Sequence, residues 1–351
     1  MTGATTPFDD DDQNVLAPSG ASVALFSKSP RETWLLNDKF ADATRTLLGG
    51  SFYQVVYRGN IASHSQNRVL STGTRLVAFQ LLPECGDFVN RVDLILDGVD
   101  SVKNVLKRID VNVGYHRFDS LNVQEDLDTQ IRVNSAFFGR RYGVVGNKLF
   151  VPLTMAPLHS TDLVRTSGTH EVRIIVHFHE NASQATIDGA RLAGCVYSVD
   201  APLRKTLFSE PHEFVTFQNQ YAGVETLKRG RNEIKLRFNY PTAAMFFWGF
   251  DKKLVTNVKL TLNALPFYDG DVETLDHFKL ARGIDVDPVM IFFSQADTTT
   301  PHRSSVNFSS INNAKLIIDT TDVNDTNLYI VTLNPHPGRY ANGMYGLQYS
   351  K

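Results

Sequence analysis

Apolar and polar residues alternate with a period of two over most of the chain that follows residue 52. In the segment 92–97, for example, Val92, Leu94 and Leu96 are each separated by one residue. The same alternation recurs in the segments 109–115, 172–178, 234–238 and 258–262. Successive side chains of a strand point to opposite faces of a sheet, so the pattern predicts many short strands with one buried face.

Helical signals are few. The segment 30–48 has helical character and is followed by Gly49 and Gly50, which would end a helix. Short helical turns are also predicted at 126–131 and 271–280, but no long amphipathic helix. Many strands with almost no helix indicate an all-β chain of antiparallel sandwiches, because a parallel sheet would need crossover helices.

The strand-rich region covers roughly 300 residues, about twice what one eight-stranded sandwich needs, so we expect two consecutive sandwiches. The seam is predicted at 180–191, a small and polar stretch after a clear strand. No fixed-period repeat relates the two halves. Residues 1 to about 20, with the acidic run Asp9–Asp12, are interpreted as a solvated, disordered tail or as a tail that orders against a neighbouring subunit.

Charge and cysteine content exclude several classes of protein. The 351 residues carry 35 Lys and Arg against 37 Asp and Glu, so no bulk positive field attracts nucleic acid or an anionic membrane. Cys85 and Cys195 are too few for a disulfide scaffold, and a bridge between them is not indicated. Residues 1–8 have no secretory signal pattern, and no apolar stretch is long enough for a membrane helix.

His177 and His179 lie two residues apart on a predicted strand, which suggests a cupin-type metal site. Such a site would need a Glu four or five residues after the pair and a Gly six residues before it. Here Glu180 follows at once, and the nearest preceding glycine is Gly168. We therefore interpret the pair as two partly exposed strand histidines.

Other chemical motifs are also missing from the sequence. His170, His212 and His302 lack zinc-ligand spacing, and neither a nucleophile elbow nor a phosphate-binding loop occurs. A carboxylate pair remains open, because such residues meet in space and not in sequence. We predict no catalytic, cofactor-binding or metal-binding residue, no cofactor and no enzymatic activity. Three N-glycosylation sequons are present, and the sequence leaves their use open: Asn181, Asn307 and Asn324.

Several segments, in order along residues 52–351, resemble the major capsid proteins of large double-stranded DNA viruses, the double jelly-roll lineage. In the first half these segments are 52–58, 82–94, 105–119, 149–153 and 171–178. In the second half they are 213–217, Lys235–Pro241 followed by 244–250, Val306–Leu316 with its Asn-Phe-Ser, and the terminal Gly-Met-Tyr-Gly-Leu of 343–347. Tyr240 stands where the family usually has His, and Gly114-Tyr115 replaces a Gly-Gly pair. No single segment is specific, but the ordered set is.

The resemblance implies two consecutive eight-stranded antiparallel jelly rolls with few short helices. An N-terminal arm, partly disordered, would cover 1–48, the first jelly roll 49–184 and the second 185–351. It also implies a structural virion protein, made in the infected host cell, whose homotrimer forms a pseudo-hexagonal capsomer of an icosahedral capsid. Implied partners are neighbouring capsomers, penton and minor capsid proteins and inner-membrane-associated viral proteins, without direct nucleic acid. The arm is expected at the inner side of the capsid.

Three alternatives stay open. The chain could be a scaffold or minor capsid protein of the same fold. It could also be a glycan-active enzyme that pairs two jelly rolls, as peptide-N-glycosidases do, or a two-domain lectin. The enzyme predicts acidic residues at the seam between the sandwiches, and the lectin predicts sugar affinity in a stable monomer or dimer.

Overall fold

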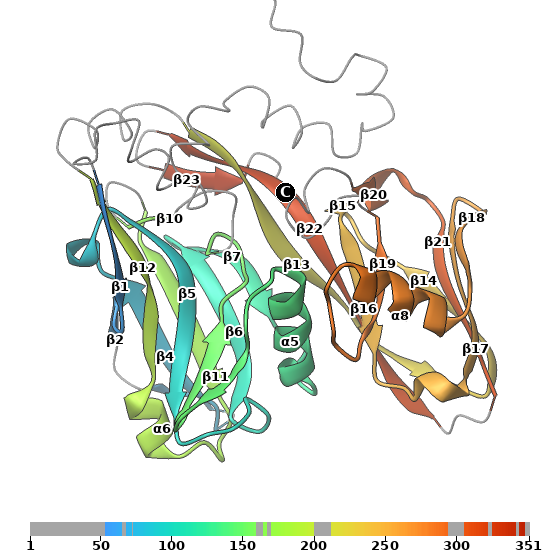
Figure 1. Ribbon diagram of the computed structural model, residues 1–351, viewed down its shortest axis with the longest axis horizontal. Coiled ribbons are helices and arrows are strands. Elements are labelled where there is room, and N and C mark those ends of the chain that lie inside the picture. The colour runs from blue at the N-terminus through green and yellow to red at the C-terminus, as the bar shows by residue number, and fades with distance from the viewer. Residues whose placement is uncertain are drawn as a thin grey trace, which may run out of the picture. The chain divides into compact units, whose positions relative to one another are not determined.

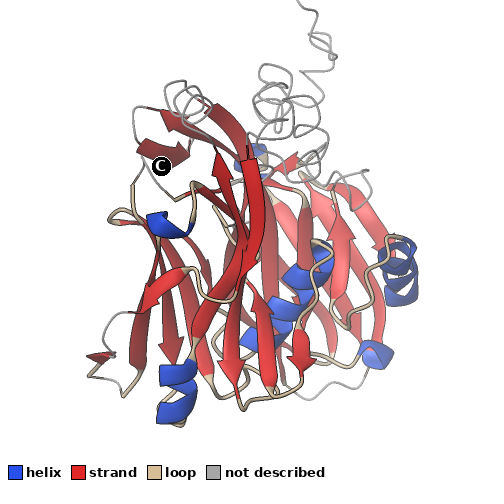
Figure 2. Cartoon of the chain, turned by 60° about the vertical axis from the view of Figure 1, so that its left-hand side comes forward, coloured by secondary structure: helices blue, strands red, loops and turns tan. Residues whose placement is uncertain are grey.

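The computed structural model describes residues 53–64, 68–71, 73–158, 164–166, 170–199, 212–293, 305–321, 325–341 and 344–347. Antiparallel sheets make up most of this part of the chain, with a few short helices among them (Figure 2). The all-β class expected from the sequence is therefore confirmed. The predicted arm of residues 1–48, with its helical segment 30–48, lies outside the described residues.

Internal contacts divide the described residues into two units. The N-terminal unit draws on 53–135, 140–218 and 336–347, and the C-terminal unit on 136–139 and 219–335. The boundaries at Gln218 and Pro335 fall inside two strands of 16 residues each, so both of these strands contribute to both units.

Two sheets form the N-terminal unit (Figure 1). One has the order β1-β12-β5-β9-β8, with β10 also paired to β5, and the other the order β2-β4-β11-β6-β7, with β3 also paired to β4. The strands are β1 (Tyr53–Arg58), β2 (Ala62–His64), β3 (Arg68–Val69), β4 (Arg75–Leu81), β5 (Phe88–Asp97), β6 (Leu106–Val113), β7 (His116–Leu121), β8 (Gly143–Val145), β9 (Lys148–Pro152), β10 (Val164–Arg165), β11 (Val172–Phe178) and β12 (Arg191–Val199). The helices are η2 (Pro83–Cys85), α5 (Leu127–Phe137) and α6 (Gln184–Gly189).

The C-terminal set of strands forms sheets of order β13-β22-β16-β19, with β23 also paired to β22, and β14-β21-β17-β18. A small sheet joins β15 to β20. The strands are β13 (His212–Leu227), β14 (Gly230–Leu236), β15 (Pro241–Thr242), β16 (Ala244–Trp248), β17 (Val255–Leu262), β18 (Leu265–Gly270), β19 (Val289–Phe292), β20 (Val306–Asn307), β21 (Ala314–Thr320), β22 (Thr326–Ala341) and β23 (Met344–Leu347). The helices are η3 (Lys252–Leu254), α8 (Val272–Ala281) and η4 (Phe308–Ser310).

The two sets of strands share one order. Eight strands of the first set, taken in chain order, are β1, β4, β5, β6, β7, β9, β11 and β12, and eight of the second are β13, β14, β16, β17, β18, β19, β21 and β22. In both sets the first, eighth, third and sixth strands form one sheet, and the second, seventh, fourth and fifth form the other. Each set also places a helix between its fifth and sixth strands, α5 in one and α8 in the other.

The period-two pattern identifies the faces that fill each core. Val92, Leu94 and Leu96 of β5 are all fully buried in the N-terminal core, as the alternation predicts. Ile234 and Leu236 of β14 are buried in the C-terminal core in the same way. Burial of such side chains contributes about 1.5–3 kcal/mol each, so these alternating positions supply much of the folding free energy.

The seam expected at 180–191 lies inside the N-terminal unit. Ser183 caps α6 by accepting a hydrogen bond from the backbone N–H of Thr186, and Ile187 packs in the N-terminal core. The following strand, β12, pairs with both β1 and β5. The small, polar stretch is therefore a short helical connection to the last strand of the unit, and the boundary falls later, in β13.

The two predicted helical turns are confirmed as helices. α8 has almost the predicted bounds and is capped by Asp271, whose carboxylate accepts a hydrogen bond from the backbone N–H of Thr274. α5 extends six residues beyond the prediction, to Phe137. Among the described residues, no helix is long and apolar enough to cross a membrane.

Candidate functional site

The histidine pair does not form a common site. His177 lies on β11 and is 8% exposed, whereas His179 follows the end of the strand and is half-buried. A register shift between His177 and Phe178 separates them. Among the described residues, no group of three His, Cys, Asp or Glu could hold a metal ion. The expectation that both histidines are partly exposed is wrong for His177, because neighbouring polar side chains cover it.

His177 belongs to a charged network on the outer face of its sheet. Its Nε2 lies 3.1 Å from Oδ2 of Asp110 and 3.1 Å from Nη2 of Arg108. Asp110 is 3% exposed and also accepts a hydrogen bond of 2.7 Å from the Ser120 hydroxyl. Burial raises the pKa of Asp110, but the hydrogen bonds from His177 and Ser120 and the charge of Arg108 outweigh it, so the pKa lies below its usual value.

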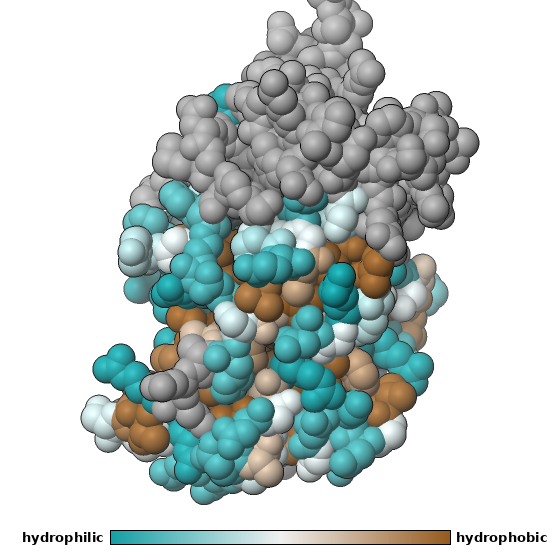
Figure 3. Space-filling view, turned by 90° about the vertical axis from the view of Figure 1, so that its left-hand side faces the viewer, coloured by the Kyte–Doolittle hydropathy of each residue, from teal (hydrophilic) through white to brown (hydrophobic). Residues whose placement is uncertain are grey.

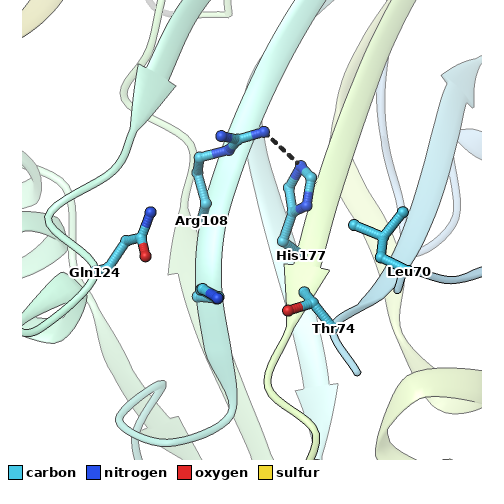
Figure 4. A pocket seen from close by; sticks show the side chains of 6 residues that line it. Leu70, Thr74, Arg108, Gln124 and His177 are labelled. Atoms are coloured by element: carbon cyan, nitrogen blue, oxygen red, sulfur yellow. Dashed lines mark hydrogen bonds between the residues drawn. The ribbon is translucent and has the colours of Figure 1, made fainter. Parts of the chain in front are cut away.

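A pocket of about 170 Å³ opens beside this network (Figure 4). Its lining residues come from β6, β11, the β3–β4 connection and the segment after β7: Leu70, Thr74, Lys107, Arg108, Gln124 and His177. In Figure 4 the Arg108 and His177 side chains point toward each other across neighbouring strands. The imidazole is thus held between a guanidinium and a carboxylate, and these contacts fix its orientation at the wall of the pocket.

A second pocket of about 340 Å³ shares Lys107 and Gln124 with the first. It is also lined by His179, whose pKa is lowered by burial and by the nearby charge of Lys107. Three acidic side chains, Glu125, Asp126 and Asp128, balance the cations there. The first pocket is lined by the cations Lys107 and Arg108, and the second by side chains of both charges, and this lining identifies no reaction.

Two segments that carry the sequence resemblance meet in the C-terminal unit. Pro241 pairs with Asn307 where β15 and β20 join, and the backbone N–H of Phe308 donates to the carbonyl of Tyr240. The Phe308 ring packs edge-to-face against Phe238, with ring centroids 5.6 Å apart. The Phe-Asn-Tyr-Pro and Asn-Phe-Ser segments therefore form two sides of one structural joint.

The terminal segment of the resemblance completes the other unit. Tyr345 of β23 is 6% exposed, belongs to the N-terminal core and lies 4.7 Å from the Phe118 ring. β23 pairs with β22 over 338–347, so the last strand is held by a backbone ladder as well as by its side chain.

Exposed apolar side chains are the remaining candidates for function. One face of the molecule shows hydrophobic side chains scattered among hydrophilic ones (Figure 3). The exposed large apolar residues are Val56, Tyr57, Val69, Tyr115, Val144, Val145, Val224, Leu265, Phe267, Phe278 and Leu280. Sequence reasoning did not single them out, although Phe278 and Leu280 interrupt the polar face of a predicted helix and could have been noticed.

The remaining sequence motifs give no reactive site. Cys85 and Cys195 are not joined in a disulfide, and both are half-buried. Asn181 is exposed, whereas Asn307 is half-buried and its side chain caps η4. Asn324 lies outside the described residues.

Comparison with known proteins relates the fold to viral capsids. No family model matches the sequence, and no curated protein matches it. Among solved structures, the chain is similar to the crystal structure of VP54 of the virus PBCV-1, with a TM-score of 0.65 and 16% identity over 86% of this chain and 98% of that one. A chain of the PBCV-1 capsid gives a TM-score of 0.63 over the same shares at 16% identity.

The major capsid protein P2 of bacteriophage PM2 has a TM-score of 0.50 and 16% identity, over 85% of this chain and 98% of that one. The similarity extends over nearly the full length of all three structures, and it agrees with the family that the ordered sequence segments resemble. The chain therefore has the fold of the viral major capsid proteins.

Proposed function

We propose that this protein is the major capsid protein of a DNA virus and that three copies form a pseudo-hexagonal capsomer. The observation that carries the proposal is the shared strand order of the two eight-stranded sets within one chain. Three copies around a threefold axis would present six similar sets, and a closed ring of this kind buries matching surfaces without forming open filaments.

The two eight-stranded sets are, in this proposal, two jelly rolls, each of two sheets. The first would end with β12 and the second begin with β13, in place of the division at residues 184 and 185 expected from the sequence. β22 then serves as the eighth strand of the second jelly roll and returns the chain to the N-terminal unit.

The protein would lie in the virion as a structural component and not as an enzyme. Its partners would be two further copies within the capsomer and neighbouring capsomers around it. Penton and minor capsid proteins would close the shell, and inner-membrane-associated viral proteins could contact its inner side. The balanced charge of the chain favours protein partners over direct contact with nucleic acid.

Light scattering on a sizing column tests the proposal. A capsomer predicts a species of about 118 kDa, three times the subunit mass of 39.2 kDa, with hexagonal outlines in electron micrographs. A stable monomer at all concentrations would overturn the trimer. The next experiments would then be glycan-binding and glycosidase assays, which test the lectin and enzyme alternatives. The copy number in purified particles separates a major coat protein from a scaffold or minor capsid protein of the same fold.

A further inference from the structure

The helices α5 and α8 occupy the same place in the two sets of strands, yet their surfaces differ. Each is followed, after one residue, by a glycine with positive φ, Gly139 at +63° and Gly283 at +72°. Alignment of these glycines pairs Ile131 with Leu275, and both of these side chains are buried in the core of their own unit. The alignment therefore superimposes the core-facing side of the two helices.

A second stripe of α5 is buried as well. Gln130, Val133, Asn134 and Phe137 follow the i, i+3, i+4, i+7 spacing of one helix face and are 0–4% exposed, although none belongs to the N-terminal core cluster. The aligned residues of α8 are Thr274, His277, Phe278 and Ala281, and all four are exposed. Phe278, the partner of fully buried Asn134, is 51% exposed, and the neighbouring Leu280 is 54% exposed.

Phe137 ends this stripe and, unlike its other members, belongs to the C-terminal unit. Within the C-terminal unit, the Phe137 ring lies 5.8 Å from that of Phe246 on β16 and 6.4 Å from that of Phe292 on β19. These are the third and sixth strands of the second set. Phe246 is fully buried but lies outside the C-terminal core cluster, so it points to the outer face of its sheet.

On the corresponding strands of the first set, β5 and β9, the outer face combines apolar side chains with two ion pairs, Asp93–Arg140 and Asp97–Arg191. Ile95 pairs with Phe150 across these strands, and neither belongs to the N-terminal core cluster. Phe150 is half-buried, and Val145 on the adjoining strand β8 is 62% exposed. Phe150 and Val145 thus offer apolar surface at the strands that correspond to those receiving Phe137, whereas Ile95 is itself only 4% exposed.

We infer that the exposed stripe of α8, with Phe278 at its centre, docks on the outer face of β5, β9 and β8 of a second copy of this chain. The inference rests on the proposed capsomer and names its contact. A ring in which first and second sets alternate needs two kinds of junction, and the α8 contact would repeat between copies the helix-to-strand packing that Phe137 makes within the C-terminal unit. Such a heterologous contact closes into a trimer when its rotation is about 120°.

Phe278→Asp tests the contact by mass. A buried aromatic anchor at an interface typically contributes 2 kcal/mol or more, so the concentration at which half of the trimers dissociate should rise by at least about 30-fold. The matched control is Tyr115→Asp, since Tyr115 is also aromatic and is fully exposed on the turn between β6 and β7, strands of the sheet that does not contain β5, β9 and β8. The control should keep the wild-type mass, and circular dichroism should show folded protein for both variants.

A second measurement identifies the partner surface. In the double variant Phe278→Cys/Val145→Cys, a short bis-maleimide should link separate copies into dimer and trimer bands on a denaturing gel. Each single variant serves as a control for reaction at Cys85 and Cys195. A band at monomer mass, with a peptide cross-link between 145 and 278 of one chain, would overturn the inference.

The two levels of the proposal fail in different ways. If the wild-type protein is a trimer, but Phe278→Asp leaves it intact and no cross-link joins copies, the α8 contact is wrong and the capsomer stands. If the wild-type protein is a monomer at all concentrations, the capsomer itself is wrong, and the contact falls with it.

Discussion

The two units share a strand order but are filled with different side chains. The N-terminal core is mostly aliphatic, with Val92, Leu94 and Ile109 fully buried, whereas the C-terminal core contains a cluster of rings formed by Phe238, Phe293 and Phe308. The difference shows that this strand order depends on where apolar positions alternate and how the strands are connected, and not on which apolar residue is used. It also explains why no repeat is visible between the halves of the sequence.

The helices α5 and α8 contact neighbouring segments through side chains of opposite charge. Asp128 of α5 accepts hydrogen bonds from Tyr142 and Arg132, and burial together with Asp128 raises the pKa of Tyr142 to about 12. In α8 the buried Lys279 donates to the carbonyls of Val286 and Pro288, and burial lowers its pKa. The contacts of α5 depend on the acidic Asp128 and those of α8 on the basic Lys279, so each set of contacts can be removed by a separate substitution.

Removal of the ring cluster should produce the largest difference between the units. Phe308→Ala should lower the free energy of unfolding of the C-terminal unit by about 4 kcal/mol, because it leaves a cavity between Phe238 and Phe293. Trp248, 5% exposed in this unit, offers a fluorescence signal for urea denaturation. The control is Phe267→Ala, since Phe267 also contacts Phe293 but is 45% exposed. Equal losses for the two variants would refute the role of the buried cluster.

Acid should lower the stability of the protein by protonating His336 on β22. His336, the first residue of β22 in the N-terminal unit, is 2% exposed, and burial lowers its pKa to about 4. The unfolded chain, with a histidine pKa near 6.5, binds the proton more readily. The stability is therefore complete above pH 6.5 and should fall by about 3 kcal/mol as the pH decreases to 4.

Denaturation midpoints measured from pH 7 to pH 4 check this loss. His336→Phe should remove most of this pH dependence, whereas His116→Phe, a variant of an exposed histidine of β7, should retain it. An unchanged acid profile in His336→Phe would place the sensitivity elsewhere.

Substitution of a glycine in the C-terminal unit should cost more stability than substitution of one in the N-terminal unit. Gly249 has φ +105°, and a Cβ there would lie 2.1 Å from the Asn327 carbonyl oxygen. Gly249→Ala should cost about 2–3 kcal/mol and lower the melting temperature. Gly98 has φ +71° with no heavy atom within 4 Å of such a Cβ, so Gly98→Ala should cost only about 1 kcal/mol for the left-handed backbone. Similar costs at both sites would show that the backbone near Asn327 moves aside.

Loss of the Tyr142 hydroxyl should have the smallest effect on the free energy of unfolding. In Tyr142→Phe, Asp128 loses the hydrogen bond of 2.5 Å from the hydroxyl but keeps those from Arg132 and Ser101. The backbone N–H of Val102 also loses its acceptor, the hydroxyl oxygen at 3.2 Å. We expect a loss of about 1 kcal/mol in the N-terminal unit, measured by urea denaturation. Tyr115→Phe, at a fully exposed tyrosine, should change nothing measurable. If Tyr142→Phe lost more unfolding free energy than Phe308→Ala, the expectation that the larger effect lies in the C-terminal unit would be wrong.

Strands were predicted well where one face meets a core and the other meets water. The alternation in 92–97 identified β5 correctly, but it did not predict the burial of Ile95, which is 4% exposed on the outer face. The alternation in 109–115 likewise gave no reason to expect that Asp110 is buried. Asp110 is covered by the side chains of His177, which is far away in the sequence, and of Arg108, which is polar, and a pattern of apolar positions predicts neither contact.

The full extent of α5 was missed for a related reason. Val133, Asn134 and Phe137 extend α5 beyond the predicted turn, since a second buried stripe outside the core cluster supports these residues. A polar connection inside a unit has the same composition as a linker between units, so composition alone does not locate the seam. Neither the charged network nor the exposed stripe of α8 carries a sequence motif, so both required the fold.

The position of Tyr345 has a consequence for synthesis on the ribosome. Its side chain belongs to the core of the unit that is made first, but it is translated only after residues 219–335. The nascent N-terminal unit must therefore wait, with part of its interior uncovered, until the intervening unit has emerged. A ribosome that stalls in this interval would hold a chain with exposed apolar surface, which is the kind of species that chaperones bind and that aggregates when they do not.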